Sequence, residues 1–450
     1  LLDRMNRTVD GEFQRYAVES GAYTREHFFG PDIRLRKMVE HLSDDEIRTL
    51  PRGGHDYRKL YAAYKAATEQ RGAPTVILAK TIKGWTLGPD VEGRNATHQI
   101  KKMTVDQLRV LRERLYLKDV IDEDALADDK EPPYIRFAEG SVEHLYMLAR
   151  RRVLDGPVPE RRVNIRKPLA MPEDKPFDEV LAGSGKQEVS TTMAFTRLLR
   201  NLCRDPNVGR RVVPIIPDEA RTFGMDALFK EFKIYAAHGQ AYEPVDAQLR
   251  LSYSESKDGQ VLEEGITEAG AMASFIAAAT SYAHRGVPML PFFTFYSMFG
   301  FQRVGDLIWS AADSRARGFL LGATAGRTTL LGEGLQHQDG HSLVLASTVP
   351  TVEAWDPAFA YEMATIIKQG VHDMLVDERD VVYYLTLYNE NYVMPPLPEG
   401  ATEGILRGLY QWADAPEGPT RRARILFSGT AQGAARAAQA ELAERWDVAA

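Results

Sequence analysis

The sequence predicts an α/β protein with tandem domains, in which parallel sheets are flanked by helices, and with the start of a further α/β domain at its end. Short apolar runs typical of buried strands recur at residues 75–81, 212–216, 287–295 and 381–388. Longer segments with helical spacing of apolar residues lie between them. Because strands that alternate with helices form parallel sheets, this order favours the α/β class.

The N-terminal part shows one helix–strand–helix passage. Residues 56–71 have helical spacing, and Gly72 and Pro74 separate them from the apolar run 75–81. A polar, glycine-bearing loop is expected over 84–102. Residues 104–116 then resume as a helix.

Two linkers are predicted from composition. Residues 122–186 combine acidic runs with five prolines between Pro157 and Pro176, and residues 394–400 read MPPLPEG. Such segments are typical of domain boundaries. The predicted domains are therefore 1–165, 166–396 and 397–450.

The second domain has clear helix signals. Ser190 is expected to cap a helix that carries Phe195, Leu198, Leu199 and Leu202 on one face. Further helices are predicted at 264–283, and from Asp356 and Pro357, as N-cap and first-turn proline, through Lys368. In the third domain, a strand at 424–429 should precede an alanine-rich helix.

Composition limits the function classes. The 450 residues carry a net charge of −7 and are 44% hydrophobic, which argues against a dedicated nucleic-acid binder. No apolar run approaches the length of a membrane span, and residues 1–10 lack the features of a signal peptide. The lone Cys203 excludes an internal disulfide and a cysteine metal cluster. We expect a cytoplasmic protein that binds neither membrane nor nucleic acid. Because the chain does not start with methionine, we expect it to be an internal fragment of a longer protein.

The segment 318–341, GFLLGATAGRTTLLGEGLQHQDGH, is the most informative part of the chain. It contains six glycines, which allow tight turns and close approach of the backbone to a ligand. Glu333, His337 and His341 add groups that can move protons. A loop at the carboxyl end of a buried strand is where open α/β sheets bind ligands, so the segment favours an enzyme.

Other candidates have simpler explanations beside the functional one. Glu268 lies in the first turns of a small-residue helix, where a glutamate also favours the helix dipole, although Glu264 and its neighbour suit that role better. Asp218 and Glu219 follow a strand and suit either a site rim or an ordinary turn. His98 lies in the polar loop, which is either a lid or plain surface.

The motif HQDGH places two histidines four residues apart. That spacing holds zinc when it lies on a helix with a central glutamate. Gln338 replaces the glutamate and Gly340 disfavours the helix, so a zinc hydrolase remains only a weak alternative.

Several blocks together resemble the pyruvate dehydrogenase E1 component of the homodimeric bacterial type. They are AKTIKGW, EGRNATHQIKKM, IIPDEARTFGM, EEGITEAG, PFFTFYSMFGFQR, GRTTLLGEGLQHQDGH and LYNENYVMP. The resemblance covers essentially the whole chain. It implies transketolase-like domains that bind thiamine diphosphate: the end of a diphosphate-binding domain, a whole pyrimidine-binding domain and the start of a C-terminal domain.

The resemblance also implies cofactor contacts. Glu268 matches the glutamate that hydrogen-bonds the N1′ atom of the aminopyrimidine ring. A carboxylic acid in apolar surroundings suits this role, because desolvation favours its protonated form. Phe299 matches the aromatic ring stacked on the pyrimidine, and Tyr296 matches a polar residue beside the reacting carbons.

Five further residues receive catalytic roles by the same resemblance. Glu333 and His337 match polar groups around the reacting carbons, and Asp218 and Glu219 match acids near the same cavity. His98 matches a histidine of a mobile loop that helps to pass the acetyl group to the lipoyl domain.

The implied reaction is oxidative decarboxylation of pyruvate with reductive acetylation of the lipoyl group of E2, the dihydrolipoyl acetyltransferase of a multienzyme complex that feeds acetyl-CoA synthesis. A homodimer with thiamine diphosphate and Mg²⁺ is implied as well. The family's GDG metal motif is absent, since Gly305 and Asp306 are followed by Leu307, and the Mg²⁺ ligands are expected before Leu1. Transketolase, 2-oxoglutarate dehydrogenase E1 and a non-catalytic scaffold remain alternatives.

Overall fold

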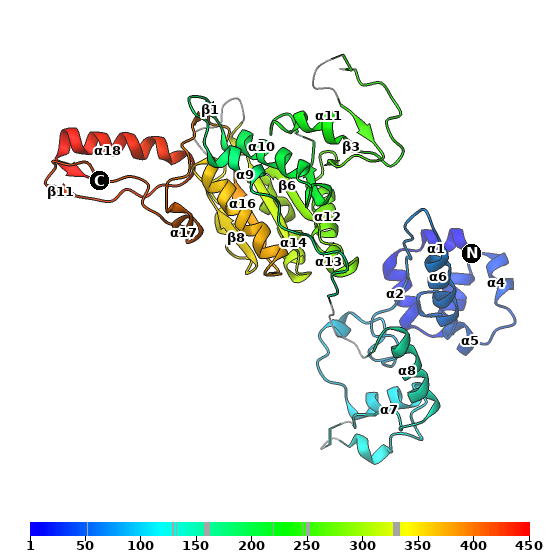
Figure 1. Ribbon diagram of the computed structural model, residues 1–450. Helices are drawn as coiled ribbons and strands as arrows, with labels where there is room; N and C mark the ends of the chain where they lie inside the picture. Colours follow the sequence, from blue (N-terminus) through cyan, green and yellow to red (C-terminus); the bar gives the residue numbers. More distant parts are fainter. Residues whose placement is uncertain are drawn as a thin grey trace. The chain divides into compact units, whose positions relative to one another are not determined.

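The chain forms two compact units, Leu1–Val158 and Pro159–Ala450 (Figure 1). The computed structural model describes residues 1–51, 53–127, 130–131, 133–156, 163–218, 220–245, 247–248, 253–326 and 334–450. Each unit is considered by itself. In the described ranges, no helix is both long enough and apolar enough to cross a membrane.

Unit 1 is helical. A small core of Phe28, Phe29, Leu35, Val39 and Ile47 holds its N-terminal helices together. Its helices are α1 (Leu2–Arg7), α2 (Asp10–Val18), α3 (Gly21–Thr24), α4 (Ile33–Met38), α5 (Asp44–Arg48), α6 (Tyr57–Glu69), α7 (Val105–Arg114) and α8 (Val142–Val153), with the shorter η1 (Arg25–Phe29), η2 (Gly53–His55), η3 (Asn95–His98) and η4 (Glu123–Leu126).

The helices predicted in this unit are confirmed, but its strand is not. Asp56 and Thr104 cap α6 and α7, which lie where helical spacing placed them. The predicted strand 75–81 is wrong, because unit 1 contains no strand among its described residues and none of them pairs with this segment. Its side chains Val76 and Leu78 are 81% and 92% exposed. The predicted linker 122–186 also contains regular structure, including the whole of α8.

Unit 2 is built on a six-stranded sheet in which every neighbouring pair is parallel. Its order is β5 (Leu262–Glu263), β2 (Val212–Ile216), β6 (Leu290–Tyr296), β7 (Gly318–Ala323), β9 (Val382–Thr386) and β8 (Val352–Trp355). The predicted strand 212–216 is confirmed, whereas those at 287–295 and 381–388 are confirmed with shifted ends. The α/β class is therefore confirmed.

The helices of unit 2 cover both faces of this sheet. They are α9 (Lys175–Leu181), α10 (Thr191–Arg204), α11 (Phe229–Phe232), α12 (Glu268–Ala279), α13 (Ser281–His284), α14 (Ser297–Asp313), α15 (Ser342–Ala346), α16 (Ala360–Leu375), α17 (Ala401–Leu406) and α18 (Gln432–Trp446), with η5 (Gly209–Arg211), η6 (Met225–Leu228), η7 (Leu335–His337) and η8 (Gly429–Ala431). Helices α9, α10 and α16 share one core with the strands, and α12 and α14 share the other. The predicted helix 264–283 is thus two helices, α12 and α13.

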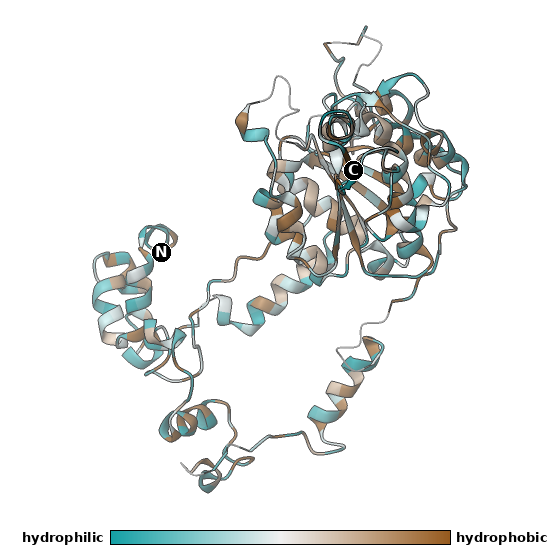
Figure 2. Ribbon diagram, turned by 90° about the vertical axis from the view of Figure 1, so that its left-hand side faces the viewer, coloured by the Kyte–Doolittle hydropathy of each residue, from teal (hydrophilic) through white to brown (hydrophobic). Residues whose placement is uncertain are grey.

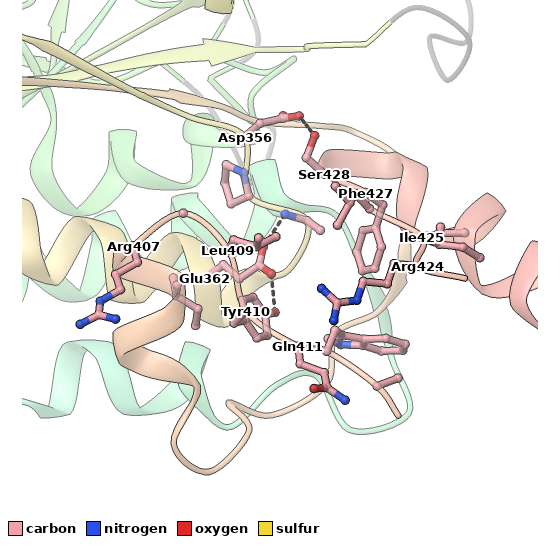
Figure 3. Close-up of a pocket in the computed structure, with 18 of the residues that line it drawn as sticks. Asp356, Glu362, Arg407, Leu409, Tyr410, Gln411, Arg424, Ile425, Phe427 and Ser428 are labelled. Carbon is pink, nitrogen blue, oxygen red and sulfur yellow. Dashed lines mark hydrogen bonds between the residues drawn. The ribbon is translucent and has the colours of Figure 1, made fainter. Parts of the chain in front are cut away.

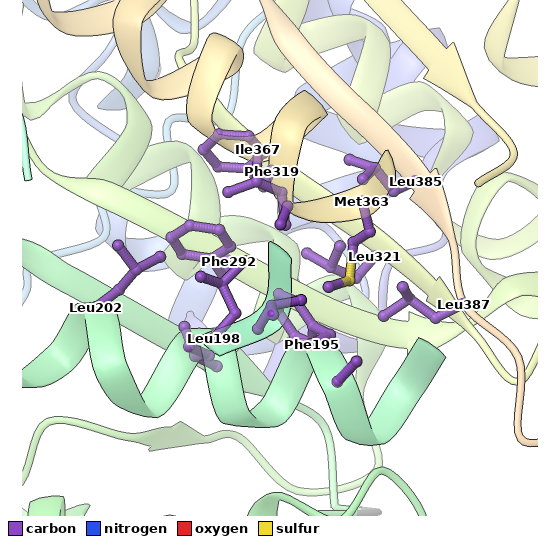
Figure 4. Packing of buried hydrophobic residues seen from close by; sticks show 14 of the residues in the cluster. Phe195, Leu198, Leu202, Phe292, Phe319, Leu321, Met363, Ile367, Leu385 and Leu387 are labelled. Atoms are coloured by element: carbon purple, nitrogen blue, oxygen red, sulfur yellow. The ribbon is translucent and has the colours of Figure 1, made fainter. Parts of the chain in front are cut away.

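Alternate strand residues enter the two cores, as the pleat requires. Phe292 packs with α10 and α16 and stacks on Phe319 at 4.6 Å (Figure 4). Phe293 points to the other side and packs in the core that contains α12. Figure 2 shows apolar residues gathered along these strands. Because both faces are buried, the strands have continuous apolar sequences. Each fully buried leucine or phenylalanine contributes about 1.5–3 kcal/mol.

The predicted start is right for helix α10 and wrong for helix α16. Ser190 caps α10 and accepts a hydrogen bond from the backbone N–H of Met193 at 3.1 Å, as predicted. The predicted start of α16 at Asp356 and Pro357 is wrong, because the helix begins at Ala360 and continues past Lys368 to Leu375. The carboxylate of Glu362 accepts from the N–H of Phe359 at 3.1 Å and satisfies this helix end.

The C-terminal segment of unit 2 contains a short strand–helix–strand passage. Strands β11 (Arg421–Arg422) and β12 (Val448–Ala449) pair in parallel and are connected by α18, which confirms the predicted alanine-rich helix. The predicted strand 424–429 is wrong, because β12 offers only two residues for pairing and they pair with β11. The remaining short strands are β1 (Glu188–Val189) with β10 (Tyr392–Val393), and β3 (Ile234–Tyr235) with β4 (Glu255–Ser256).

Candidate functional site

The candidate site lies where the direction of strand order reverses in the sheet. Strand β2 has β5 on one side and β6 on the other, so the chain leaves β2 in one direction and later returns on the opposite side. In parallel α/β sheets, ligands bind outside the carboxyl ends of the strands at such a point. Asp218 follows β2 and Tyr296 ends β6, so the topology places both at this edge.

Three of the residues predicted for the site are in mutual contact here. The ring of Tyr296 lies 4.6 Å from that of His337 and 6.1 Å from that of Phe299, and Phe299 lies 5.2 Å from His337. Helix α14 begins directly after β6, which brings Phe299 next to Tyr296. The turn η7 brings His337 from a different segment.

Arg303 joins Glu268 to these rings. Glu268 is the first residue of α12, its side chain is 14% exposed, and its Oε1 lies 2.5 Å from an Arg303 guanidinium nitrogen. The same guanidinium lies 4.0 Å from the centroid of the Phe299 ring. We call Glu268, Tyr296, Phe299, Arg303 and His337 the site cluster. The surroundings of Glu268 are thus less apolar than its helix sequence implied.

Sequence analysis did not single out Arg303. The available signal was its spacing, since a residue four positions after Phe299 on a helix lies on the same face. Its pairing with Glu268, 35 residues earlier, had no local signal.

His337 presents a buried polar atom to the site. Among the described residues, none forms a hydrogen bond with its Nδ1 atom. An imidazole nitrogen buried without a partner is costly, and such atoms are rare in native proteins. A ligand that hydrogen-bonds this nitrogen would remove that cost.

The other predicted residues are not brought to the site cluster by described contacts. Asp218 is exposed after β2, and His98 lies in η3 of unit 1 with its Nδ1 2.6 Å from the Nζ of Lys83. Glu219 and Glu333 lie outside the described residues. His341 lies beside α14, where its Nε2 is 2.5 Å from the side-chain nitrogen of Gln302.

Potential metal ligands among the described residues gather elsewhere. His372, Asp373 and Asp377 come within reach of one ion at the end of α16. The buried Asp373 already accepts hydrogen bonds from Gln369 and Tyr383 and pairs with Arg379. Because these donors occupy its oxygens, this group is explained by structure alone. The two histidines of HQDGH are not part of it.

A cavity of 850 Å³ lies away from the site cluster, between the start of α16 and residues 405–428 (Figure 3). Two hydrogen bonds connect its sides: Tyr410 donates to Glu362 Oε1 at 2.5 Å, and the Ser428 hydroxyl donates to Asp356 Oδ2 at 2.5 Å. None of the predicted site residues lines it. We call Asp356, Glu362, Tyr388, Tyr410 and Ser428 the anchor cluster, because it attaches the C-terminal segment. A smaller cavity of 420 Å³ in unit 1 is lined by α2 and residues 80–83 and 93–95.

The fold and the site cluster together define an α/β protein with a candidate ligand site at the carboxyl edge of a parallel sheet. A family model described as "Pyruvate dehydrogenase E1 component middle domain" matches residues 169–395. The chain belongs to the pyruvate dehydrogenase E1 component family.

Relatives named "Pyruvate dehydrogenase E1 component" match along nearly the whole chain. The protein of Mycobacterium tuberculosis is 54% identical over 452 residues, which is 100% of this chain and 48% of that protein. The protein of Escherichia coli is 48% identical over 431 residues, 96% of this chain and 48% of that protein. The chain thus spans about half the length of these curated relatives. A transketolase structure from Campylobacter jejuni matches with a TM-score of 0.44 and 16% identity, covering 80% of this chain and 50% of that one.

Proposed function

We propose that the protein containing this chain is a pyruvate dehydrogenase E1 component, which decarboxylates pyruvate with thiamine diphosphate and acetylates the lipoyl group of an E2 dihydrolipoyl acetyltransferase. Family membership supports this, and so does the name shared by the relatives that match 96–100% of the chain. Another thiamine-diphosphate enzyme, such as transketolase or 2-oxoglutarate dehydrogenase E1, is the alternative.

The contact between Glu268, Arg303 and the Phe299 ring is the observation that carries the proposal. This contact brings an acid on α12 next to an aromatic ring on α14, at the edge of the sheet where the strand order reverses. An aminopyrimidine needs both, a carboxyl group for its ring nitrogen and an apolar face for its plane. The buried Nδ1 of His337, which has no partner among the described residues, supports a polar ligand beside them.

Each residue of the site cluster then has a separate task. Glu268 exchanges a hydrogen bond with the pyrimidine nitrogen, and Phe299 stacks on its ring. Tyr296 and His337 direct polar atoms toward the substrate, where His337 can hold or move a proton at Nδ1. When bound, thiamine diphosphate supplies the carbon nucleophile and the electron sink, which protein side chains lack.

The remaining site residues complete the proposal. Asp218, Glu219 and Glu333 are proposed as acids around the substrate, and His98 as the residue that assists acetyl transfer to the lipoyl group. The use of Mg²⁺, a homodimer, a cytoplasmic location and the domain limits at 165/166 and 396/397 stay predictions.

The test is release of CO₂ from pyruvate by the full-length enzyme, with and without thiamine diphosphate and Mg²⁺. Glu268→Ala should lower cofactor-dependent release by a factor of about 10² or more, as expected when a proton-transferring group is lost. Glu403→Ala is the matched control, because Glu403 also pairs with an arginine but is 75% exposed. Release from 2-oxoglutarate or from ketose phosphates in place of pyruvate would overturn the substrate assignment.

A further inference from the structure

We propose that Asp339 is a positioning residue that holds His337 against Tyr296 and Phe299. The proposal rests on the proposed function for its kinetic consequence only. Its structural consequence, the fixed position of the His337 ring, can be tested on its own.

Asp339 is a buried carboxylate whose oxygens are both used. The residue is 7% exposed, and its Oδ1 accepts from the backbone N–H groups of His341 at 3.1 Å and Ser342 at 3.0 Å. The hydroxyl of Ser342 donates to its Oδ2. Burial alone would raise the pKa of Asp339, but the hydrogen bonds from Ser342 and His341 lower it below the ordinary value. The carboxylate therefore stays ionised and keeps its hydrogen-bond donors, the N–H groups of His341 and Ser342 and the Ser342 hydroxyl.

The backbone of Asp339 fixes the same loop to the sheet. Its N–H donates to the carbonyl of Gly326 at 3.0 Å, just beyond the end of β7. The N–H groups of His337 and Gln338 donate to Gly334 and Leu335, within the turn η7 itself. Asp339 is thus where the turn that carries His337 becomes attached to the rest of unit 2.

The loop is also attached on the side of α14. His341, whose N–H is held by Asp339, places its Nε2 2.5 Å from the Gln302 side chain. Helix α14 carries Phe299, so Asp339 connects the His337 turn both to the sheet and to the helix that supplies the opposing ring. Loss of the carboxylate would free the N–H groups of His341 and Ser342 and the Ser342 hydroxyl. The backbone hydrogen bond to Gly326 would then be left to hold the turn without this support.

A plain structural role is the competing explanation, since Asp339 also satisfies the start of α15. Asp205 provides the matched control. It is likewise buried, at 6% exposure, and its carboxylate accepts from the N–H groups of Asn207 and Val208 at 2.8 and 3.0 Å. It belongs to the turn after α10 and has no described contact with the site cluster.

The first experiment reads the position of His337 without activity. In the 450-residue chain with ¹³C-labelled histidine, the His337 ring signal, assigned by its loss in His337→Ala, should be displaced by the ring currents of Tyr296 and Phe299. Asp339→Ala should move it toward the value of a free histidine, and Asp205→Ala should leave it in place. An unmoved signal in Asp339→Ala would overturn the proposal.

The second experiment is a double-mutant cycle in the full-length enzyme. Asp339→Ala should lower kcat for CO₂ release by about 10²-fold, the usual cost of a displaced catalytic group, with little change in KM. In a His337→Ala background the same change should have almost no further effect, because it acts through His337. Equal losses in both backgrounds would show that Asp339 acts on stability alone. If the wild-type enzyme releases no CO₂, the proposed function fails and the ring signal still decides the role of Asp339.

Discussion

The site cluster and the anchor cluster both contain a glutamate in the first turn of a helix, but the two carboxylates are used differently. Glu362 accepts from Tyr410 through Oε1 and from the N–H groups of Ala358 and Phe359 through Oε2. Glu268 has one described hydrogen-bond partner, the exposed Arg303, and His337 nearby has a buried nitrogen that no described residue satisfies. A carboxylate whose oxygens both accept hydrogen bonds from its own chain stabilises the fold. Polar atoms that lack some of their hydrogen bonds can instead form them with a ligand.

The largest effect that separates the clusters is expected from removing these two carboxylates. Glu362→Ala leaves two backbone N–H groups and the Tyr410 hydroxyl without their acceptor, so unit 2 should lose about 3 kcal/mol of unfolding free energy. Glu268→Ala removes an ion pair with a half-exposed arginine and should cost less than about 1 kcal/mol. Urea unfolding of the two variants compares them directly. Equal losses would mean that Glu268 is as structural as Glu362.

The packing of α14, the helix that carries Phe299 and Arg303, can be tested by substituting two of its glycines. A Cβ atom on Gly300 would lie 2.0 Å from the Phe295 ring, whereas one on Gly305 would meet nothing within 4 Å. Gly300→Ala should therefore lower the unfolding free energy by about 2 kcal/mol through overpacking. Gly305→Ala should raise it by up to about 1 kcal/mol through helix propensity.

Thermal unfolding of these two glycine variants gives the check. Because Phe299 precedes Gly300, the destabilised variant should also lose cofactor-dependent CO₂ release in the full-length enzyme. Activity retained in a destabilised Gly300→Ala would show that α14 can shift without disturbing the site.

A smaller, pH-dependent effect is expected in the anchor cluster. Burial raises the pKa of Glu362 above its ordinary value of 4.5, against the opposing hydrogen bonds of Tyr410 and the backbone. The folded state therefore keeps a proton that the unfolded state releases. This contribution is complete below the unfolded pKa and is lost as pH rises through the folded pKa.

In the Glu362→Gln variant the side chain cannot ionise, so this variant does not lose stability as Glu362 of the wild type loses its proton. Its unfolding free energy relative to the wild type should therefore increase as the pH rises above the ordinary glutamate pKa value of 4.5. Glu403→Gln, at a 75% exposed side chain, is measured beside it as the surface control. Denaturant midpoints measured across this range test the sign, and a difference that falls with pH would contradict it.

The sequence predicted those elements whose signal is local. The apolar run at 212–216 predicted a buried strand because both faces of a parallel strand are covered, and Ser190 predicted a helix start because the cap is made within three residues. The equally apolar run at 75–81 failed, since a run of residues does not reveal whether a partner strand exists. Glu362 was missed because Tyr410, its partner, lies 48 residues later in the chain. His337 was already indicated by the glycine-rich segment 318–341, whereas Tyr296 and Phe299 came from a family resemblance, which carries long-range information that spacing lacks.

The extended segment 75–79, TVILA, has a consequence for handling the chain. It combines β-branched and apolar residues without charge or proline, which is the composition of segments that stack into intermolecular sheets. Val76 and Leu78 are 81% and 92% exposed, and no described residue pairs with the segment as a strand. We therefore expect self-association of the 450-residue chain to begin here, by backbone pairing between copies. Lys80, the adjacent charge, would limit that growth in the manner of a gatekeeper residue.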